Sequence, residues 1–243
     1  MDTQGLKAYY DQAFKKKLES TPGECLCSPS LLAWTDANSS IWYKNDPMLA
    51  IELGCGAKSV LVELSLPEKS KCFGVDFSRV TIDHALLNSQ NDKIVYECFD
   101  VLEMDTHLSV KNFDFDLVID GHLFHCLTNE RVRQQYLSSV LRKLQVKRGY
   151  FVLECMVETG PLAFADDFLF LEDVRVLLQQ IGKNAVPVRY IPRIDQLLEQ
   201  FKQSGFKIVK FLCPPGWKII ADSRRVEPID GDPGLARFLL APM

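Results

Sequence analysis

Short apolar runs alternate with amphipathic stretches along the chain from about residue 48 onward. The runs are near-continuous in hydrophobic residues, as is typical of strands buried on both faces of a sheet. We expect strands at 48-MLAIEL, 71-KCFGVDF, 93-KIVYECF, 113-FDFDLVID, 148-RGYFVLECMV, 206-FKIVKFLC and 235-LARFLLAP. Helical patterns lie between them near 58–65, 79–89, 129–144 and 192–204. This alternation predicts an α/β fold with a doubly wound, mostly parallel sheet. Only a short GDPG turn region precedes 235-LARFLLAP, so we expect that last strand to pair antiparallel with the strand at 206–213.

Two regions lie outside the alternation. Residues 1–47 contain helical patterns at 4–18 and 31–43, joined by the turn-rich loop TPGECLCSPS, and predict a helical cap in front of an α/β domain at 48–243. Residues from about 157 to 190 interrupt the alternation with a segment far longer than the few residues usual for such connections. We interpret this segment, including a helical LEDVRVLLQQIG, as an inserted lid after the fifth strand.

Composition and charge narrow the function classes. The 243 residues are 47% hydrophobic and 25% charged, as in an ordinary globular protein. The net charge of −4 disfavours binding to nucleic acid, which needs a dense basic face. No apolar stretch suits a membrane span or a secretory signal, so we expect no membrane association. The eight cysteines are scattered without a CxxC pair, which favours free thiols in a reducing cytoplasm and gives no metal site. Monomer and homodimer stay open.

The strongest chemical motif follows the first expected strand. Glu52-Leu53-Gly54-Cys55-Gly56 ends that strand, and its glycines allow a tight turn and close approach of a ligand to the backbone. Asp76 lies twenty residues past Gly56 at the end of the next strand, where a carboxylate can accept both hydroxyls of a ribose. These residues fit either a dinucleotide or another adenosine-containing ligand.

Glu52 favours a cationic ligand over a pyrophosphate. A carboxylate at the mouth of a strand–helix junction repels phosphate and suits an ammonium or a sulfonium. The third glycine of a dinucleotide motif is absent, because Ser59 stands in its place, and a P-loop spacing is absent too. A nicotinamide-dependent oxidoreductase is therefore disfavoured.

Taken in order, the Gly-rich motif, Asp76, 99-FDVLEMD and 113-FDFDLVIDGHLFHCL resemble the class I S-adenosylmethionine-dependent methyltransferases. The resemblance implies a Rossmann-like, seven-stranded sheet with an antiparallel last strand, and S-adenosylmethionine as cofactor. It implies that Asp76 binds the ribose, Asp100 meets the adenine amino group, and Asp120 flanks the methionine amino group. The cofactor-binding residues that it implies are Glu52, Gly54, Cys55, Gly56, Asp76, Phe77, Asp100, Val101, Asp120 and Gly121. Lys58 departs from the pattern, because many members carry Gly there; it either points outward or pairs with the carboxylate of the ligand.

Residues for the methyl acceptor are less sharply defined. A general base is needed only if the acceptor starts protonated, and His122 and His125 after the fourth strand are the candidates. For His125 a packing role is favoured over a catalytic one, and for His122 the two interpretations are balanced. Aromatic residues of the N-terminal helices and the insertion are candidates for the acceptor pocket, with core packing as the alternative: Tyr9, Tyr10, Trp34, Phe164 and Tyr190.

The predicted function is methyl transfer from S-adenosylmethionine to a nitrogen or oxygen, less readily a sulfur, of a small molecule. A protein acceptor stays open. The alternative is a non-catalytic binding module on the same fold, for which Lys58 in the Gly-rich loop is the one sequence feature.

Overall fold

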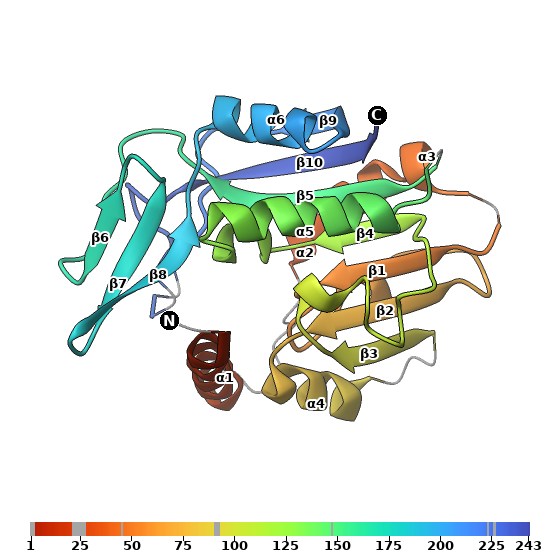
Figure 1. Ribbon diagram of the computed structural model, residues 1–243, viewed down its shortest axis with the longest axis horizontal. Coiled ribbons are helices and arrows are strands. Elements are labelled where there is room, and N and C mark those ends of the chain that lie inside the picture. The colour runs from red at the N-terminus through yellow and green to blue at the C-terminus, as the bar shows by residue number, and fades with distance from the viewer. Residues whose placement is uncertain are drawn as a thin grey trace.

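A seven-stranded sheet forms the centre of the computed structural model, which describes residues 3–20, 28–44, 46–89, 93–146, 148–222, 224–225 and 227–243 (Figure 1). Its strand order is β3-β2-β1-β4-β5-β10-β9. The strands are β1 (Leu49–Leu53), β2 (Lys71–Asp76), β3 (Ile94–Cys98), β4 (Leu117–Asp120), β5 (Tyr150–Val157), β9 (Phe206–Leu212) and β10 (Gly234–Pro242). Strands β1 to β5 pair in parallel, and β10 pairs antiparallel with both β5 and β9. The predicted fold class, with its antiparallel last strand, is therefore confirmed.

Helices cover both faces of this sheet. Helices α5 (Glu130–Lys143) and α6 (Ile194–Gln203) pack on one face, where Tyr136 and Phe201 join the largest hydrophobic cluster. On the other face lie α2 (Pro29–Ala37), α3 (Ser39–Trp42) and α4 (Arg79–Asn88), with Trp42 in a second cluster. Because side chains alternate along a strand, each central strand contributes residues to both clusters. The near-continuous apolar runs of the sequence follow from this double burial.

The described N-terminal region forms the helices α1, α2 and α3. Helix α1 (Thr3–Ser20) matches the expected helix at 4–18, and it packs against α4 (Figure 1). The expected helix at 31–43 is two helices, α2 and α3, because the chain turns at Asn38. The side-chain amide of Asn38 donates to the carbonyl of Trp34 and so caps the C-terminal end of α2. Cys25 and Cys27 lie outside the described residues; the six described cysteines are free.

The insertion after β5 contains a small β-sheet where the sequence predicted a helix. Residues 171–182 do not form a helix; the insertion instead folds as a three-stranded antiparallel sheet of β6 (Phe168–Leu171), β7 (Val176–Ile181) and β8 (Asn184–Tyr190). Gly182 at φ +61° lies in the tight turn that joins β7 to β8, a conformation that favours glycine. Pairing with β6 and β8 thus overrides the helical spacing of the leucines and valines. Figure 1 shows this small sheet standing beside the end of the main sheet.

The predicted helix at 58–65 is also wrong. Only a single 3₁₀ turn, η1 (Val60–Val62), follows the Gly-rich loop. Ser59 caps its start, and Pro67 lies shortly after its end, where proline disfavours helical conformation in the residue before it. Among the described helices, none combines the length and apolarity that crossing a membrane requires.

Candidate active site

The carboxyl ends of the parallel strands meet at one edge of the main sheet, where open α/β sheets bind their ligands. Strands β1, β2 and β4 end there at Leu53, Asp76 and Asp120. Helix α1 lies beside this edge on one side, and the three-stranded sheet lies beyond it (Figure 1). The edge therefore brings together residues from the N-terminus, the central strands and the insertion.

The Gly-rich loop turns tightly over the end of β2. The amides of Gly54 and Cys55 both donate to the carbonyl of Val75, at 2.8 and 2.9 Å. Gly54 has φ +72°, and a Cβ there would lie 2.8 Å from the Cβ of Leu123, so only glycine fits. Gly56 has φ +59°, but a Cβ there would meet no atom within 4 Å. The loop thus exposes backbone to open space at Gly56, as close approach of a ligand requires.

Glu52 lies beneath this loop rather than at its mouth, which corrects the sequence interpretation. It is 4% exposed, and its Oε2 accepts the hydroxyl of Ser59 and, at 2.7 Å, the amide of Val60. Burial raises the pKa of Glu52 to about 8, opposed by those two hydrogen bonds and increased by the nearby charges of Asp120 and Asp76. The other oxygen, Oε1, lies 3.7 Å from where a Cβ of Gly121 would be.

Asp76 lies at the end of β2, next to the loop. Its Oδ2 accepts the amide of Gly56 at 3.0 Å, and its Oδ1 accepts the amide of Ser78 at 2.9 Å. Burial raises the pKa of Asp76, although hydrogen bonds from Ser78, Gly56 and Thr81 oppose the shift. The predicted adenine-side residues are less enclosed: Asp100 is half-buried and caps the 3₁₀ turn that begins at Val101.

Asp120 occupies a different position from the one that the resemblance implied. Strand alternation directs its side chain toward α5, where Oδ2 accepts the hydroxyl of Tyr136 at 2.7 Å. Its Oδ1 accepts the amides of Leu123 and Phe124, so both oxygens serve to fix the turn after β4. Burial raises the pKa of Asp120 to about 6. The side chain of Asp120 thus stabilises the turn after β4. Gly121, the next residue, packs closely, because a Cβ there would lie 3.1 Å from the side chain of Leu31.

Lys58 points away from the loop. Its ammonium lies 2.7 Å from the carboxylate of Glu63, and both side chains are partly exposed. Of the two orientations left open by the sequence, the outward one is observed. The feature that favoured a non-catalytic module therefore has a local structural explanation.

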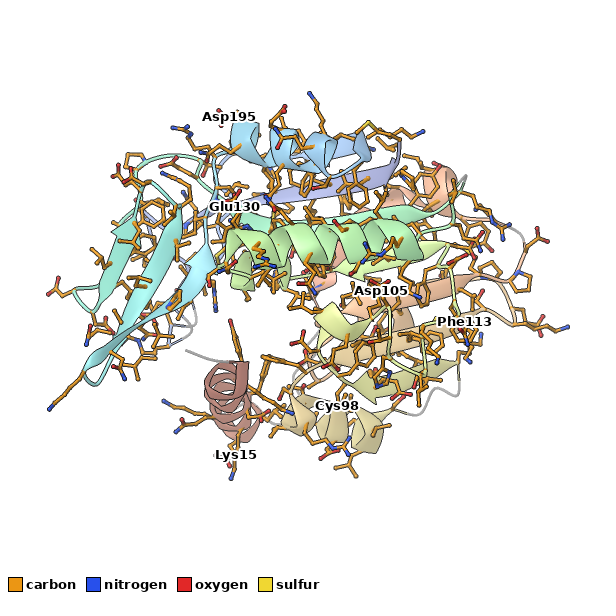
Figure 2. The ribbon with its side chains drawn as sticks, in the orientation of Figure 1. Lys15, Cys98, Asp105, Phe113, Glu130 and Asp195 are labelled. Atoms are coloured by element: carbon orange, nitrogen blue, oxygen red, sulfur yellow. The ribbon has the colours of Figure 1, made fainter. Side chains whose placement is uncertain are left out.

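Among the described side chains, Tyr10 joins helix α1 to the insertion. The ring of Tyr10 packs edge-on against Phe77, with 5.6 Å between ring centroids, and its hydroxyl accepts Nη1 of Arg189 from β8 at 3.1 Å. Tyr10 thus links the residue that follows Asp76 to the insertion. Nothing is described for the side chain of Tyr9. Lys15 lies on the outer side of α1 and points away from the sheet (Figure 2).

His122 follows the end of β4 and contacts a carboxylate that the sequence analysis missed. Its Nε2 lies 2.7 Å from Oε1 of Glu154 on β5, and its ring is half-exposed while Glu154 is buried. Oε2 of Glu154 accepts Nε of Arg237 on β10 at 2.5 Å. A signal for both missed residues existed, since each is a single charge within an apolar strand, and a buried charge needs a partner.

His125 does not take part in this arrangement. It is 3% exposed, and burial together with the charges of His122 and Arg189 holds its pKa well below the usual value. A buried imidazole that stays neutral is poorly placed to take a proton from an acceptor. Of the two catalytic candidates, His122 is half-exposed and His125 is buried.

Three of the predicted acceptor-site aromatics are also packing residues. Trp34 lies in the hydrophobic cluster on the α2 face of the main sheet. Tyr190 lies in the largest hydrophobic cluster, where the guanidinium of Arg133 is 3.4 Å from the ring centroid of Tyr190. Phe164 packs against Phe168 and Phe170 within the insertion. Their burial explains why aromatic content alone did not locate the acceptor pocket.

Comparison with known proteins shows which domains and folds this chain resembles. The family model described as a methyltransferase domain matches residues 51–153. A search of the curated proteins gives no match. Among solved structures, the CcbJ methyltransferase from Streptomyces caelestis is 14% identical with a TM-score of 0.61, covering 92% of this chain and 94% of its own. The 1,6-didemethyltoxoflavin N1-methyltransferase of Burkholderia thailandensis is 14% identical with a TM-score of 0.63, covering 98% and 88%.

A third neighbour shows that the fold hosts more than one chemistry. The [4+2]-cyclase SpnF is 13% identical with a TM-score of 0.63, covering 99% of this chain and 96% of its own. At such identities the structural likeness shows the fold alone, and the residues of the site must carry the functional argument. The family match over residues 51–153, the strand topology and the Gly-rich loop together support a methyltransferase domain of the class I S-adenosylmethionine-dependent type.

The described residues fit S-adenosylmethionine as the cofactor. The open space at Gly56 lies next to Asp76, and the carboxyl groups of Glu52 and Asp100 lie along the same edge. This set of acidic groups suits a ligand that carries a sulfonium and an ammonium. Among the described residues, no cluster of histidine, cysteine or acidic side chains has the geometry of a metal site.

Proposed function

We propose that this enzyme methylates an oxygen or nitrogen nucleophile of a small molecule, with His122 as the general base. The observation that carries the proposal is the contact between Nε2 of His122 and Oε1 of Glu154 at 2.7 Å, with the imidazole half-exposed at the ligand edge. A histidine oriented by a carboxylate is the usual arrangement for taking a proton near neutral pH. A sulfur acceptor fits less well, because a thiol ionises more readily without such a base.

Each participating residue has a separate task. Bound S-adenosylmethionine supplies the methyl group on a sulfonium sulfur, which keeps the electron pair of the carbon–sulfur bond when that bond breaks. The loop at Gly54 and Gly56, together with Asp76, would hold the nucleoside part. His122 takes the proton of the acceptor's O–H or N–H, so that the lone pair on oxygen or nitrogen can form the bond to the methyl carbon. The imidazolium then releases that proton to water.

The enclosure of the site supports a small acceptor. Tyr10 from α1 and Arg189 from β8 are hydrogen-bonded to each other across the edge of the sheet, which narrows access from that side. The overall charge of −4 gives no basic face for a nucleic acid. We also propose a cytoplasmic location, supported by the free thiols of the six described cysteines. Monomeric and homodimeric forms are both compatible with the proposal.

Turnover with a panel of small phenols, alcohols and amines tests the proposal, with S-adenosylhomocysteine as the measured product. For an acceptor that starts protonated, His122→Ala should lower kcat by about 10²- to 10⁴-fold while affinity for S-adenosylhomocysteine is retained. His84→Ala, on α4 away from the edge, is the matched control and should leave turnover unchanged. Equal turnover by both variants would remove the base role. Product formation only with macromolecular acceptors would overturn the small-molecule class.

A further inference from the structure

The carboxylate that contacts His122 is itself held by a buried cation. Glu154 and Arg237 are direct neighbours in the antiparallel register of β5 and β10, and strand alternation directs both side chains toward α2. Their side chains are 1% and 2% exposed, and Nε of Arg237 lies 2.5 Å from Oε2 of Glu154. The two oxygens of Glu154 therefore have different partners, Arg237 on Oε2 and His122 on Oε1.

Helix α2 anchors the other end of this network. Nη2 of Arg237 donates to the hydroxyl of Ser30 at 2.6 Å, and the hydroxyl of Ser28, the N-cap of α2, donates to Oε1 of Glu154 at 3.4 Å. The indole of Trp217 covers the guanidinium at 5.0 Å from its ring centroid. Arg237 is thus fixed by contacts on several sides.

The ionic state of Glu154 follows from these contacts. Burial by itself raises the pKa of a carboxyl group, but hydrogen bonds and charge from His122 and Arg237 outweigh it and hold the pKa of Glu154 below its usual value. Other titratable groups of the described residues near His122 include His125, whose ring centroid is 5.6 Å away, Asp120, and Cys126, whose thiol donates to the carbonyl of His122 at 3.3 Å. His125 is neutral, so it does not compete for the proton.

We propose that Arg237 is a positioning residue that sets the tautomer of His122: by keeping Glu154 a carboxylate, it places the imidazole proton on Nε2 and leaves Nδ1 as the basic nitrogen that faces the acceptor. The inference rests on the proposed function, because it specifies which atom of the base takes the proton. A carboxylate can only accept hydrogen bonds, so the nitrogen that contacts it must carry the hydrogen. The proton from the acceptor then goes to the lone pair of Nδ1, and the resulting imidazolium returns it to water from the same atom.

Nitrogen-15 NMR of the imidazoles in the full-length chain, with S-adenosylhomocysteine present, tests this directly. The chain has 4 histidines, and the spectrum of His122→Gln assigns the signals of His122 by their loss. At a pH where the ring is neutral, Nε2 of His122 should give the signal of a protonated nitrogen and Nδ1 that of an unprotonated one. The reverse pattern in the unmodified protein would overturn the proposal, whether or not any variant folds.

Variants of Arg237 extend the test to catalysis. Arg237→Met should abolish the preference for the Nε2–H tautomer and lower kcat more than tenfold, with KM for S-adenosylmethionine changed less than twofold. Arg237→Lys, which restores a positive charge, should recover both the tautomer and part of kcat, which a merely structural role would not require. Arg131→Met, an exposed arginine on α5, is the matched control and should change neither. Unaltered tautomer and kcat in Arg237→Met would refute the positioning role.

The role of His122 as the base and the role of Arg237 as its positioning residue can be refuted separately. If His122→Ala keeps full turnover, the proposed base is wrong even when the tautomer is as expected. If the tautomer is reversed while His122→Ala loses turnover, the base stands and the role of Arg237 is wrong.

Discussion

Buried carboxyl groups occur in both halves of this site, but their electrostatic surroundings are opposite. On the cofactor side, burial raises the pKa values of Glu52, Asp76 and Asp120, and among the described residues none of the three forms an ion pair. On the acceptor side, Glu154 is just as buried, yet Arg237 and His122 hold its pKa below the usual value. The protein thus supplies its own cation on one side only. On the cofactor side the acids are instead held by hydrogen bonds from Ser59, Gly56 and Tyr136.

The largest expected effect comes from removing the cation on the acceptor side. Arg237→Met leaves the buried carboxyl group of Glu154 without its arginine, which should lower the free energy of unfolding by about 3–5 kcal/mol. The double variant Arg237→Met/Glu154→Leu removes both charges and should recover most of this loss. Urea denaturation monitored by circular dichroism measures both. A double variant as unstable as the single one would show that packing, not the unpaired charge, is responsible.

Glu52, on the cofactor side, should make the stability of the folded protein fall as pH rises, which is the opposite of the effect expected for Glu154. Because the folded-state pKa of Glu52 is raised from 4.5 to about 8, the folded protein binds the extra proton between these values. Its stability should therefore fall as pH rises from about 4.5 to about 8. Glu52→Gln, which stays neutral, should be more stable than the unmodified protein at pH 9 by about 2–4 kcal/mol, with no such gain at pH 4.

Denaturation of the ligand-free protein at the two pH values checks this prediction. Glu103→Gln, an exposed acid, is the control and should show no pH-dependent gain. Glu154→Gln should show the reverse trend, because a lowered pKa gives stability that is present above about pH 4.5 and is lost as pH falls through the folded-state value. The same pH trend for Glu52→Gln and Glu154→Gln would contradict the opposite pKa shifts of these two carboxyl groups.

A smaller effect is expected at Asp76, on cofactor affinity. Asp76→Ala removes the carboxylate beside Gly56 and should weaken binding of S-adenosylhomocysteine by about 1–3 kcal/mol. Calorimetric titration measures the loss. An unchanged dissociation constant would mean that Asp76 only fixes the loop and does not contact the ribose.

The smallest effect is expected at Lys58, which pairs with Glu63 at the partly exposed surface. Lys58→Ala should change the free energy of unfolding by about 1 kcal/mol or less. Its affinity for S-adenosylhomocysteine should equal that of the unmodified protein in the same titration. A clear loss of affinity would place Lys58 among the ligand-binding residues instead.

The main sheet could be predicted because its strands carry a local signal. The apolar runs that end at Leu53, Asp76 and Asp120 are strands in the structure, and the glycines at 54 and 56 adopt the positive φ that the motif requires. The insertion could not be predicted in the same way. Residues 171–182 have leucine and valine spacings that suit a helix, and only pairing with two neighbouring strands makes them a strand and turns.

Sequence by itself determined the strands of the main sheet with the helices α4, α5 and α6 between them, the Gly-rich turn, and the acids and histidines that follow the strand ends. These follow from local patterning and from where parallel strands end. Tertiary structure alone decided what each group does. It turned Asp120 toward Tyr136, buried His125 while leaving His122 half-exposed, and brought Arg237 beside Glu154 across a separation of 83 residues. The reason is that burial and charge pairing depend on which side chains meet across strands, and that is set by register and by the packing of α2, not by neighbours along the chain.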